Sequence, residues 1–413
     1  MTVNRRKTRT LVAGLAVLGL VAAGCGSDDD KSDGSSSGTT VAPRTITPSK
    51  DFTLPEPVSI VAIIGDPSNS KDPNAIPDFN NGIRLAIDEI NSVGGIGGHP
   101  ISFEAIDTSP TDPNAATNSL NLALEKNPTV ILGPISSTIG LALAPRIAEA
   151  QVPTIVHVVE PRLAKSQQGN EWLWVNRPNN TEAADITGQY AVEELGAETV
   201  GVLATNTTFG SQGVEGIKAG VGEAGGEVTV ERTFEFNATD LTEPVTAMSD
   251  VAAIIDWGTP NTLALSITTL AQQAIDKPHL GPGSVGFPSF VKAVGDNSLL
   301  ENVYGTLDCN PTDDDRPTTQ QFVQAYEDEY GEPPSYSSAE MYDAVYIIRN
   351  VIEAAESAEA TAIQEGLDSL DWSDGTCALT YKNKDNFLVH QAVIAKFNGS
   401  GELITQKTYE DLG

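Results

Sequence analysis

The stretch that decides the fold is TVILGPISSTIGLALAPRIAEA, residues 129–150. It opens with the apolar run Val130–Leu132, which is short and rich in β-branched residues and is therefore typical of a buried strand. Gly133-Pro134 ends that strand. A helix is predicted to follow, because apolar residues recur at four-residue spacing and form one buried face. That face consists of Ile139, Leu143 and Ile147. The stretch thus predicts a strand, a tight turn and a helix N-terminus.

The start of this helix is a candidate binding site for an anion. Ser136, Ser137 and Thr138 place hydroxyl groups where the helix begins. The first turn of a helix also presents unpaired backbone N–H groups and about half a positive charge, which favour a carboxylate or a phosphate. The alternative is an ordinary N-cap that binds no ligand, so the rest of the chain has to decide between the two.

Length and charge narrow the class of protein. The chain has 413 residues, of which 39% are hydrophobic, enough for two domains of ordinary size. Its formal net charge of −32 favours solubility and argues against nucleic acid or an anionic membrane surface as a partner. The charge does not define the ligand, because a binding site can differ in sign from the surface around it.

Residues 1–24 have the features of a secretory leader. A basic start precedes the apolar segment Leu11–Val21, which is too short to span a bilayer, and small residues then lead to Cys25. Small residues before a lone cysteine resemble the signal of bacterial lipoproteins, in which the leader is cleaved and the cysteine thiol carries a diacylglyceryl group. The alternative is a plain secretory signal with an incidental cysteine. Residues 25–57 are rich in Ser, Gly, Asp, Thr and Pro and are predicted to form a disordered tether.

Lipidation of Cys25 would leave Cys309 and Cys377 as an even pair in an oxidising compartment. A disulfide between them would close a loop of about 70 residues and stabilise the fold by roughly 4 kcal/mol. The sequence leaves open whether this bond forms. Two thiols and four scattered histidines do not make a zinc site, so we expect neither a metal nor a cofactor.

From Val58 onward, short apolar runs alternate with amphipathic stretches, and the alternation restarts at about residue 181. The expected strands span 58–64, 101–106, 130–132, 152–159, 199–204, 228–236, 252–256, 303–309, 376–381, 389–397 and 403–408. The last two would form a hairpin. Besides the helix of the opening stretch, the expected helices span 79–93, 113–126, 181–195, 210–224, 261–275, 318–330 and 339–357. The alternation predicts parallel sheets covered by helices on both faces.

The expected fold class is α/β, with two doubly wound parallel-sheet lobes side by side. Strands return after the βα series, so the chain is expected to cross back to the first lobe and then over again. The first lobe would comprise residues 58–176 plus 308–385, and the second residues 177–307 plus 386–413. Ligands collect at the carboxyl ends of strands in such sheets, so a cleft between the lobes would be lined by loops from both.

The sequence argues against an enzyme. Residues 281–286 fit the GxGxxG spacing of a nucleotide loop, but Pro282 removes an amide donor and the preceding strand is weak. The glycine-rich residues 94–98 follow a helix rather than a strand. The chain has no Ser–His–acid order in a strand–elbow context, no metal cluster and no convincing phosphate loop.

A series of short motifs runs in order through residues 57–413. It comprises Asn81-Gly82, Ala86-Ile87-Asp88-Glu89-Ile90-Asn91, Gly94-Gly95-Ile96-Gly97-Gly98, Asp112-Pro113, Gly133-Pro134-Ile135-Ser136-Ser137, Leu195-Gly196-Ala197, Phe209-Gly210 and Glu223-Ala224-Gly225-Gly226. Each motif is weak alone, and the combination in this order is specific. It resembles the leucine/isoleucine/valine-binding family of type I periplasmic binding proteins. The resemblance implies two lobes on a three-strand hinge that close on a small solute and deliver it to an ABC permease.

The resemblance also implies a set of ligand-binding residues. The backbone of Ile135 and the hydroxyl of Ser137, with Ser136 between them, would hold the substrate carboxylate, which agrees with a helix N-terminus at that point. Three residues of the second lobe occupy the family's aromatic cleft wall and a loop that supplies a further aromatic contact. They are Phe209, Trp257 and Thr259.

Departures from the family's pattern bear on the substrate. The small-residue run that takes the ammonium group of an amino acid is here His157-Val158-Val159-Glu160-Pro161. The acidic residue expected in the second lobe falls near Gly283-Ser284, which carries no charge. A buried ammonium without an acceptor costs several kcal/mol, so a free branched-chain amino acid would need Glu160 or Asp66 as a substitute acceptor. The alternatives are that Glu160 is a solvated loop acid and that His157 is a strand residue with a satisfied ring.

Together, these observations predict a solute-binding lipoprotein outside the cell membrane, anchored by lipid on Cys25. It would capture a small carboxylate- or amide-bearing, amino-acid-like solute for an ABC importer. We expect a monomer that meets the membrane only through its anchor and its permease and that does not bind nucleic acid. The alternative function is a ligand-sensing receptor domain for a membrane signalling partner.

Overall fold

The computed structural model describes residues 44–64 and 78–412, all within one compact unit, Val41–Gly413. Residues 1–43, 65–77 and 413 lie outside the described residues. The predicted leader, the lipidation site Cys25 and the candidate ligand contact Asp66 therefore fall outside them as well. In the two described ranges, no helix combines the length and the apolar character that a membrane span requires.

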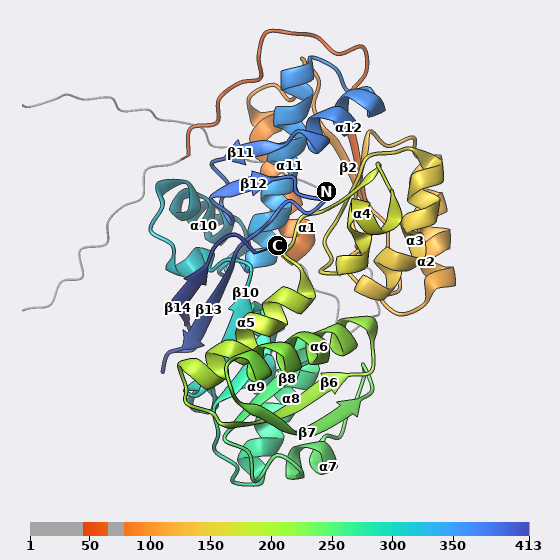
Figure 1. Ribbon diagram of the computed structural model, residues 1–413. Helices are drawn as coiled ribbons and strands as arrows, with labels where there is room; N and C mark the ends of the chain where they lie inside the picture. The colour runs from red at the N-terminus through yellow and green to blue at the C-terminus, as the bar shows by residue number, and fades with distance from the viewer. Residues whose placement is uncertain (1–43, 65–77, 413) are drawn as a thin grey trace, which may run out of the picture. The chain divides into compact units, whose positions relative to one another are not determined.

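The first sheet has five parallel strands (Figure 1). Across the sheet, they are β2 (Ser102–Ala105), β1 (Ser59–Ala62), β3 (Val130–Leu132), β4 (Thr154–Val156) and β5 (Leu173–Val175). The helices that cover it are α1 (Asp78–Ser92), α2 (Pro113–Glu125), α3 (Ser137–Ala150) and α11 (Tyr336–Ala355). Successive residues of a strand point to opposite faces. The face with Ile60 and Val130 therefore packs on α1 and α11, and the face with Val61 and Ile131 packs on α2 and α3.

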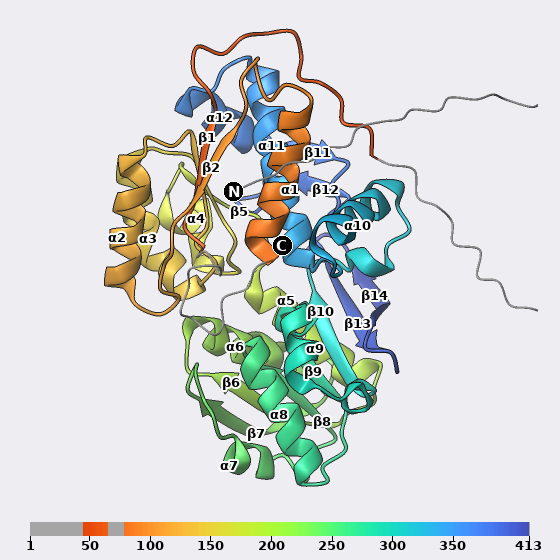
Figure 2. The same ribbon diagram turned by 180° about the vertical axis from the view of Figure 1, so that it is seen from behind.

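Helices α1 and α11 lie side by side in both views of the chain (Figures 1 and 2). Gly82 of α1 permits their close approach, because a Cβ atom there would lie 2.1 Å from the carbonyl oxygen of Ser338 on α11. This contact is a structural reason for glycine in the Asn81-Gly82 motif.

The second sheet has seven strands and is mixed. Across the sheet, they are β14 (Leu403–Tyr409), β13 (Ala392–Phe397), β10 (Val303–Leu307), β9 (His279–Pro282), β8 (Ala253–Trp257), β6 (Thr199–Thr205) and β7 (Glu227–Phe234). Strands β6 to β10 are parallel, whereas β13 and β14 form the predicted antiparallel hairpin at one edge. Helices α5 (Asn180–Glu193) and α6 (Thr208–Glu223) cover one face, and α7 (Thr242–Thr246) and α8 (Pro260–Gln272) cover the other.

Both sheets repeat one strand order. Numbered within each series, the first sheet runs 2-1-3-4-5, and so does the parallel part of the second, with β6 as its first strand. This is a doubly wound arrangement whose order reverses between β1 and β3 and again between β6 and β8. The predicted α/β class with two doubly wound lobes is confirmed. Below, the first lobe means the five-stranded sheet with its helices, and the second lobe means the seven-stranded sheet with its helices.

The chain passes between the two sheets three times, after β5, after β10 and before β13. The segment that precedes β13 lies along β5, because Val175 donates a backbone hydrogen bond to Asn386 and accepts one from Leu388. The first two crossings are joined by an ion pair between Arg177 and Asp308. The crossings are therefore bonded to one another and form the hinge expected for this fold.

Shorter elements complete the fold. They are α4 (Lys165–Gln168), α9 (Pro288–Val294), α10 (Pro317–Tyr330), α12 (Ala360–Asp368), β11 (Asp371–Ser373), β12 (Thr380–Lys382) and the 3₁₀ turns Pro161–Leu163, Gly283–Gly286, Asn297–Leu300 and Pro311–Asp313. The strand expected at 376–381 is β12, which pairs only with β11 in a small separate sheet. Strands β5, β9 and β11 and helices α4, α7, α9 and α12 were not anticipated from the sequence, although the segment before Gly281 was considered a weak strand candidate and is β9.

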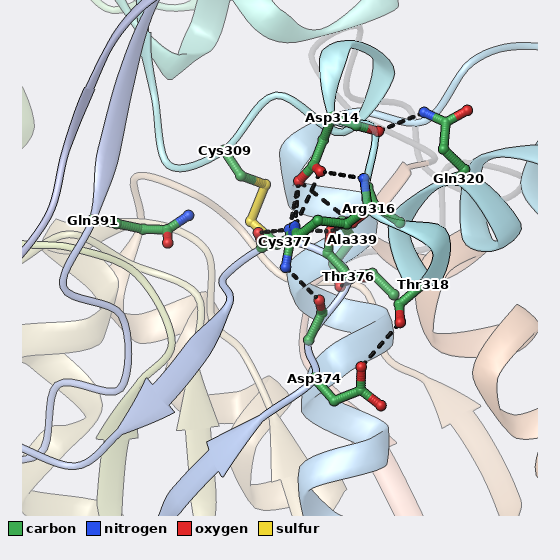
Figure 3. A network of polar contacts seen from close by, with 12 residues as sticks. Cys309, Asp314, Arg316, Thr318, Gln320, Ala339, Asp374, Thr376, Cys377 and Gln391 are labelled. Carbon is green, nitrogen blue, oxygen red and sulfur yellow. Dashed lines mark hydrogen bonds and ion pairs between the residues drawn. A yellow bond between two sulfur atoms is a disulfide. The ribbon is translucent and has the colours of Figure 1, made fainter.

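The cysteine pair that the sequence leaves open is bonded in the structure, as Cys309 Sγ joins Cys377 Sγ. Figure 3 shows Arg316, at the start of α10, beside this bond. Its guanidinium donates to the carbonyl oxygens of Gly375 at 3.1 Å and Cys377 at 2.8 Å and is itself paired with Asp314. The loop that carries Cys377 is thus held by charge-assisted hydrogen bonds as well as by the disulfide.

The last part of the predicted tether packs on the first lobe. Leu54 is buried, and its N–H donates to the carbonyl oxygen of Gly97 at 3.0 Å. The Arg44 guanidinium lies over the rings of Tyr342 and Tyr346, at 5.1 and 4.6 Å from their centroids. The composition of residues 25–57 does not reveal this docking. The docking depends on the single side chains of Arg44 and Leu54 rather than on an apolar run.

Candidate functional site

A cavity of about 200 Å³ lies where the strand order of each sheet reverses. In the first lobe it is lined by Ile64, which follows β1, and by residues 134–139, which follow β3. In the second lobe it is lined by Thr207 and Phe209 after β6 and by residues 258–260 after β8. This is the position at which doubly wound sheets bind ligands. Drug-sized sites enclose about 300–1,000 Å³, so this cavity fits a smaller solute.

The N-terminus of α3 lines the cavity and has no side-chain cap. The Ser136 hydroxyl, the expected cap, donates instead to the carbonyl oxygen of Pro110 at 2.7 Å. The first hydrogen bond of the helix runs from the Gly140 N–H to Ser136, so the amides of the preceding turn are free to bind an anion. Ser137 is 5% exposed, and its hydroxyl has no hydrogen-bond partner among the residues that the structure describes.

His157 lines the cavity, but its ring is already bonded within the protein. Its Nδ1 lies 3.0 Å from Asn176 Oδ1, and its Nε2 lies 2.9 Å from Ser337 Oγ. Burial, and then the nearby Arg177 guanidinium, lower the pKa of His157 well below its usual value. The ring is therefore neutral and acts as a structural part of the cavity wall.

Glu160 does not line the cavity. It is fully buried, and its Oε1 accepts hydrogen bonds from the Arg162 backbone at 2.9 Å, Arg162 Nε at 2.8 Å and Gln212 Nε2 at 2.7 Å. The carboxylate is thus neither an acceptor for a ligand ammonium nor a solvated loop acid. Its neighbour Val159 does line the cavity.

Two aromatic residues of the second lobe are stacked, and only one reaches the cavity. Phe209 lines it, and Trp257 lies behind, with ring centroids 6.0 Å apart and planes inclined by 29°. Trp257 Nε1 donates to Asn180 Oδ1 at 2.9 Å, and Asn180 Nδ2 donates to the carbonyl oxygen of Phe209 at 2.8 Å. Trp257 therefore supports Phe209 rather than contacting a solute itself.

Of the remaining candidate residues in the second lobe, some line the cavity and one does not. Thr259 and Ser284 line the cavity. The Thr259 hydroxyl also caps α8. Gly283 lies outside the lining, where a Cβ atom would approach the Tyr336 hydroxyl to 2.7 Å. The structure thus brings together Ile135, Ser136, Ser137, His157, Val159, Phe209, Thr259 and Ser284 and leaves Glu160, Trp257 and Gly283 outside the lining.

The wall on the hinge side of the cavity was not predicted from the sequence. Phe79, Phe287 and Tyr336 line it from three separate segments, and Arg177 lines it from the first crossing. Arg177 is paired with Asp308, and its guanidinium lies 4.9 Å from the centroid of the Tyr336 ring. One feature of the sequence could have pointed to Arg177. It is a lone arginine between β5 and α5, and Pro178 follows it just before the helix begins.

Comparison with known proteins gives one family. A Leu/Ile/Val-binding protein homolog of Brucella abortus is 20% identical over 302 residues, which cover 71% of this chain and 79% of that relative. The branched-chain amino acid transporter substrate binding protein LivJ of Streptococcus pneumoniae, solved with isoleucine, superposes with a TM-score of 0.73 at 24% identity, over 85% of this chain and 100% of that one.

A solute binding protein of Rhodopseudomonas palustris, solved with benzoate, superposes with a TM-score of 0.76 at 17% identity, over 86% of this chain and 97% of that one. The likeness to these two structures concerns the fold. A family model described as periplasmic binding protein matches residues 61–402. Because this match spans most of the chain, the protein belongs to the periplasmic binding protein family, whose members bind solutes for transport systems and are not enzymes.

Proposed function

We propose that the protein is an extracytoplasmic receptor that captures a small carboxylate-bearing solute for an ABC importer. The observation that carries this proposal is the α3 N-terminus, which presents uncapped amides and the unpartnered Ser137 hydroxyl to the cavity. A helix N-terminus of this kind favours a negatively charged group. The relatives named for branched-chain amino acids and the neighbour solved with benzoate support a small acid with an apolar body.

The rest of the cavity suits the body of such a solute. Ile135 and Phe79 of the first lobe and Phe209 of the second contribute apolar surface to its lining. Acidic side chains are scarce there: Asp107 is the one acidic residue in the described lining, and it is exposed to solvent. A buried ammonium would need a close acceptor, so the described part of the lining favours an acid without an amino group over a free amino acid.

Capture would involve closure of the two lobes about the hinge. We assign residues 58–176 plus 308–385 to the first lobe and residues 177–307 plus 386–413 to the second. The solute would contact α3 of one lobe and Phe209 of the other, so that it adds contacts only when the lobes are closed. Moving such an equilibrium from mostly open to mostly closed requires a differential affinity of about 5.5 kcal/mol.

The remaining parts of the proposal concern location and partners. Residues 1–24 would be removed, lipid on Cys25 would hold the monomer at the outer face of the cell membrane, and the closed form would dock on an ABC permease. Mass spectrometry of the intact mature protein expressed in a bacterial host would show a mass increase of one diacylglyceryl group at Cys25. A mature protein without that increase would contradict the anchor while leaving solute capture intact.

The test of solute capture is a ligand screen. The purified protein would be analysed by mass spectrometry for a co-purified small molecule and screened by thermal shift against carboxylates, amides and amino acids. We expect at least one carboxylate to raise the melting temperature. Ser137→Ala should weaken its binding by at least about 10-fold, the size expected for a hydrogen bond to a charged group. Ser211→Ala, on the exposed side of α6, is the matched control. A screen in which no carboxylate binds would exclude the proposal.

A further inference from the structure

The described lining of the cavity contains one strong positive charge, and the proposed function assigns no role to it. Among the described lining residues, Arg177 is the only lysine or arginine. It lies in the first crossing of the hinge, far in the sequence from the α3 N-terminus that would hold the solute carboxylate. Burial lowers the pKa of Arg177, but the nearby Asp308 and Tyr336 raise it by more than burial lowers it. The pKa therefore lies above its usual value, and the side chain stays charged.

Arg177 does not use all its donors within the protein. Nε donates to Asp308 Oδ2 at 2.6 Å, and Nη2 donates to Asp308 Oδ1 at 2.9 Å. A guanidinium has five N–H donors, and two bonds leave three donors, both on Nη1 and one on Nη2. No described residue accepts a hydrogen bond from them. Because the residue lines the cavity, a solute can supply the missing acceptor.

A second buried carboxyl group lies near Arg177 without cancelling its charge. Glu340 Oε2 is 3.8 Å from Arg177 Nε and 3.6 Å from His157 Nε2. Asn176 Nδ2 lies toward the carbonyl oxygen of Glu340, so Asn176 Oδ1 faces His157 and accepts from Nδ1. His157 Nε2 then carries no proton and accepts a hydrogen bond from the Ser337 hydroxyl.

This arrangement keeps Glu340 neutral. Both of its oxygens are buried, no described residue donates a hydrogen bond to them, and Oε2 faces the unprotonated nitrogen of His157. Burial, and then the adjacent Asp308, raise the pKa of Glu340 well above its usual value. Arg177 is therefore opposed by one carboxylate rather than two, and its free edge still attracts an anion.

An aromatic wall connects the two polar ends of the cavity. The Phe79 ring lies 5.2 Å from His157 and 5.8 Å from Phe287, and the Phe287 ring lies 5.4 Å from Tyr336. Tyr336 in turn packs on the Arg177 guanidinium. At the other end, the His157 N–H donates to the carbonyl oxygen of Pro134, just before α3. A solute bound at α3 thus extends along these rings toward Arg177.

We propose that Arg177 is a second anchor for the solute and that the solute is a short acid with another anionic group at its far end, a dicarboxylate being the simplest case. One carboxylate binds at the α3 N-terminus, the apolar body lies against the aromatic wall, and the second carboxylate takes the free N–H groups of Arg177. The inference rests on the proposed function, because it takes the first carboxylate at α3 as given.

The test compares acids that differ only at the far end. The native protein is titrated calorimetrically with pentanoate against glutarate, hexanoate against adipate, and benzoate against 4-carboxybenzoate. In at least one pair, we expect the diacid to bind at least 10-fold more tightly than the monoacid, because a charge-assisted hydrogen bond adds to the binding. Monoacids that bind as tightly as their diacids overturn the role of Arg177 and leave the proposed function standing. If no acid binds, both fail.

A variant separates direct contact from a structural role. Arg177→Gln combined with Asp308→Asn removes the ion pair as a unit, so that no buried charge is left unpaired. We expect the ratio of the two dissociation constants to fall to about 1. A purely structural role of Arg177 in the hinge would weaken both acids together and preserve the ratio, which would overturn the proposal. Arg146→Gln, an exposed arginine on α3, is the matched control and should keep the ratio. If the double variant does not fold, the comparison of acids on the native protein still decides.

Discussion

Gln212 on α6 donates a hydrogen bond of 2.7 Å to the carboxylate of Glu160, which follows β4. Both side chains are buried. Glu160 belongs to the first lobe and Gln212 to the second, so this bond joins the lobes at a point separate from the hinge crossings. An ionised acceptor makes the bond stronger than one between neutral groups. The contact therefore stabilises the arrangement of lobes in which the cavity is formed.

We expect Gln212→Met to weaken solute binding, because the variant keeps the size of the side chain and removes the bond between the lobes. A hydrogen bond to a charged group contributes about 1.5–3 kcal/mol, so the dissociation constant of a bound acid should rise by about 10-fold or more. Isothermal titration calorimetry measures it. Gln189→Met is the control, since among the described residues the Gln189 side chain bonds only within its own helix, to Asp185. An unchanged dissociation constant would show that the bond does not contribute to closure.

Much of the fold could be predicted because it depends on local periodicity. The strand, turn and helix of residues 129–150, the Asp112 cap with Pro113 and the C-terminal hairpin each follow from residues close together in the sequence. Strand β5 was missed because its three residues lie among tryptophans and a proline, where no alternation is visible. Its identity as a strand depends on pairing with β4 and with Phe387.

The lining of the cavity was predicted as far as single loops define it and missed where distant segments meet. Ser137 was placed at the cavity because the helix start is visible in the sequence, and its role in binding stays a prediction. The place of Glu160 was not found, because its partner Gln212 comes from the other lobe. Arg177 was missed for the same reason, as Asp308 and Tyr336 approach it only after folding. An ion pair between two crossings of the hinge joins residues far apart in the chain, so a single sequence does not show which charges will meet.

Reduction of the Cys309–Cys377 disulfide should destabilise the folded protein. The bond joins residues 68 positions apart. Loss of a cross-link that closes a loop of this length lowers the free energy of unfolding by about 4 kcal/mol. Urea unfolding with and without dithiothreitol measures the change. The double variant Cys309→Ser with Cys377→Ser is the control, because dithiothreitol should leave its unfolding midpoint where it was. Equal midpoints for the oxidised and reduced native protein would contradict the expectation.

Stability should fall as the pH rises from 6.5 to 8 because of Asp256. Burial raises the pKa of this carboxyl from 3.8 to about 8, although a weak contact from the Ser266 hydroxyl acts in the opposite direction. In this range the folded state keeps a proton on Asp256 that the unfolded state has lost. The free energy of unfolding therefore falls as the pH rises toward the pKa of Asp256 in the folded state. The contribution of Asp256 to the slope is about 1.4 kcal/mol per pH unit near pH 6.5 and falls to about half of that at pH 8. The adjacent His279, whose pKa burial lowers from 6.5 to about 4, acts mainly below this range.

Asp256→Asn removes this titration while keeping the shape of the protonated side chain. Urea unfolding between pH 6.5 and 8 should therefore show a flatter pH profile for the variant than for the native protein. Asp240→Asn is the control, because Asp240 lies on the surface and should leave the profile unchanged. Parallel profiles for the native protein and Asp256→Asn would mean that Asp256 titrates in the folded state as it does in the unfolded one.

Arg44 should fix the segment that leads into the first lobe. Its guanidinium lies over the Tyr342 and Tyr346 rings and donates to the Tyr342 hydroxyl. The hydroxyls of Tyr342 and Tyr346 in turn donate to the Glu89 carboxylate. A desolvated cation–π contact contributes about 2 kcal/mol. Arg44→Ala should therefore release the segment and speed tryptic cleavage after Lys50 by about 10-fold or more, as followed by mass spectrometry under native conditions.

The matched control for Arg44→Ala is Arg84→Ala. Arg84 lies over the Phe103 ring at 4.9 Å from its centroid, so the control removes a contact of the same kind from a helix of the same lobe. It does not touch the segment that carries Lys50, and the rate of cleavage there should stay at the native value. Equal cleavage rates for Arg44→Ala and the native protein would show that the segment is held by Leu54 and the Thr47 carbonyl, which accepts from Arg349 at 2.6 Å, without help from Arg44.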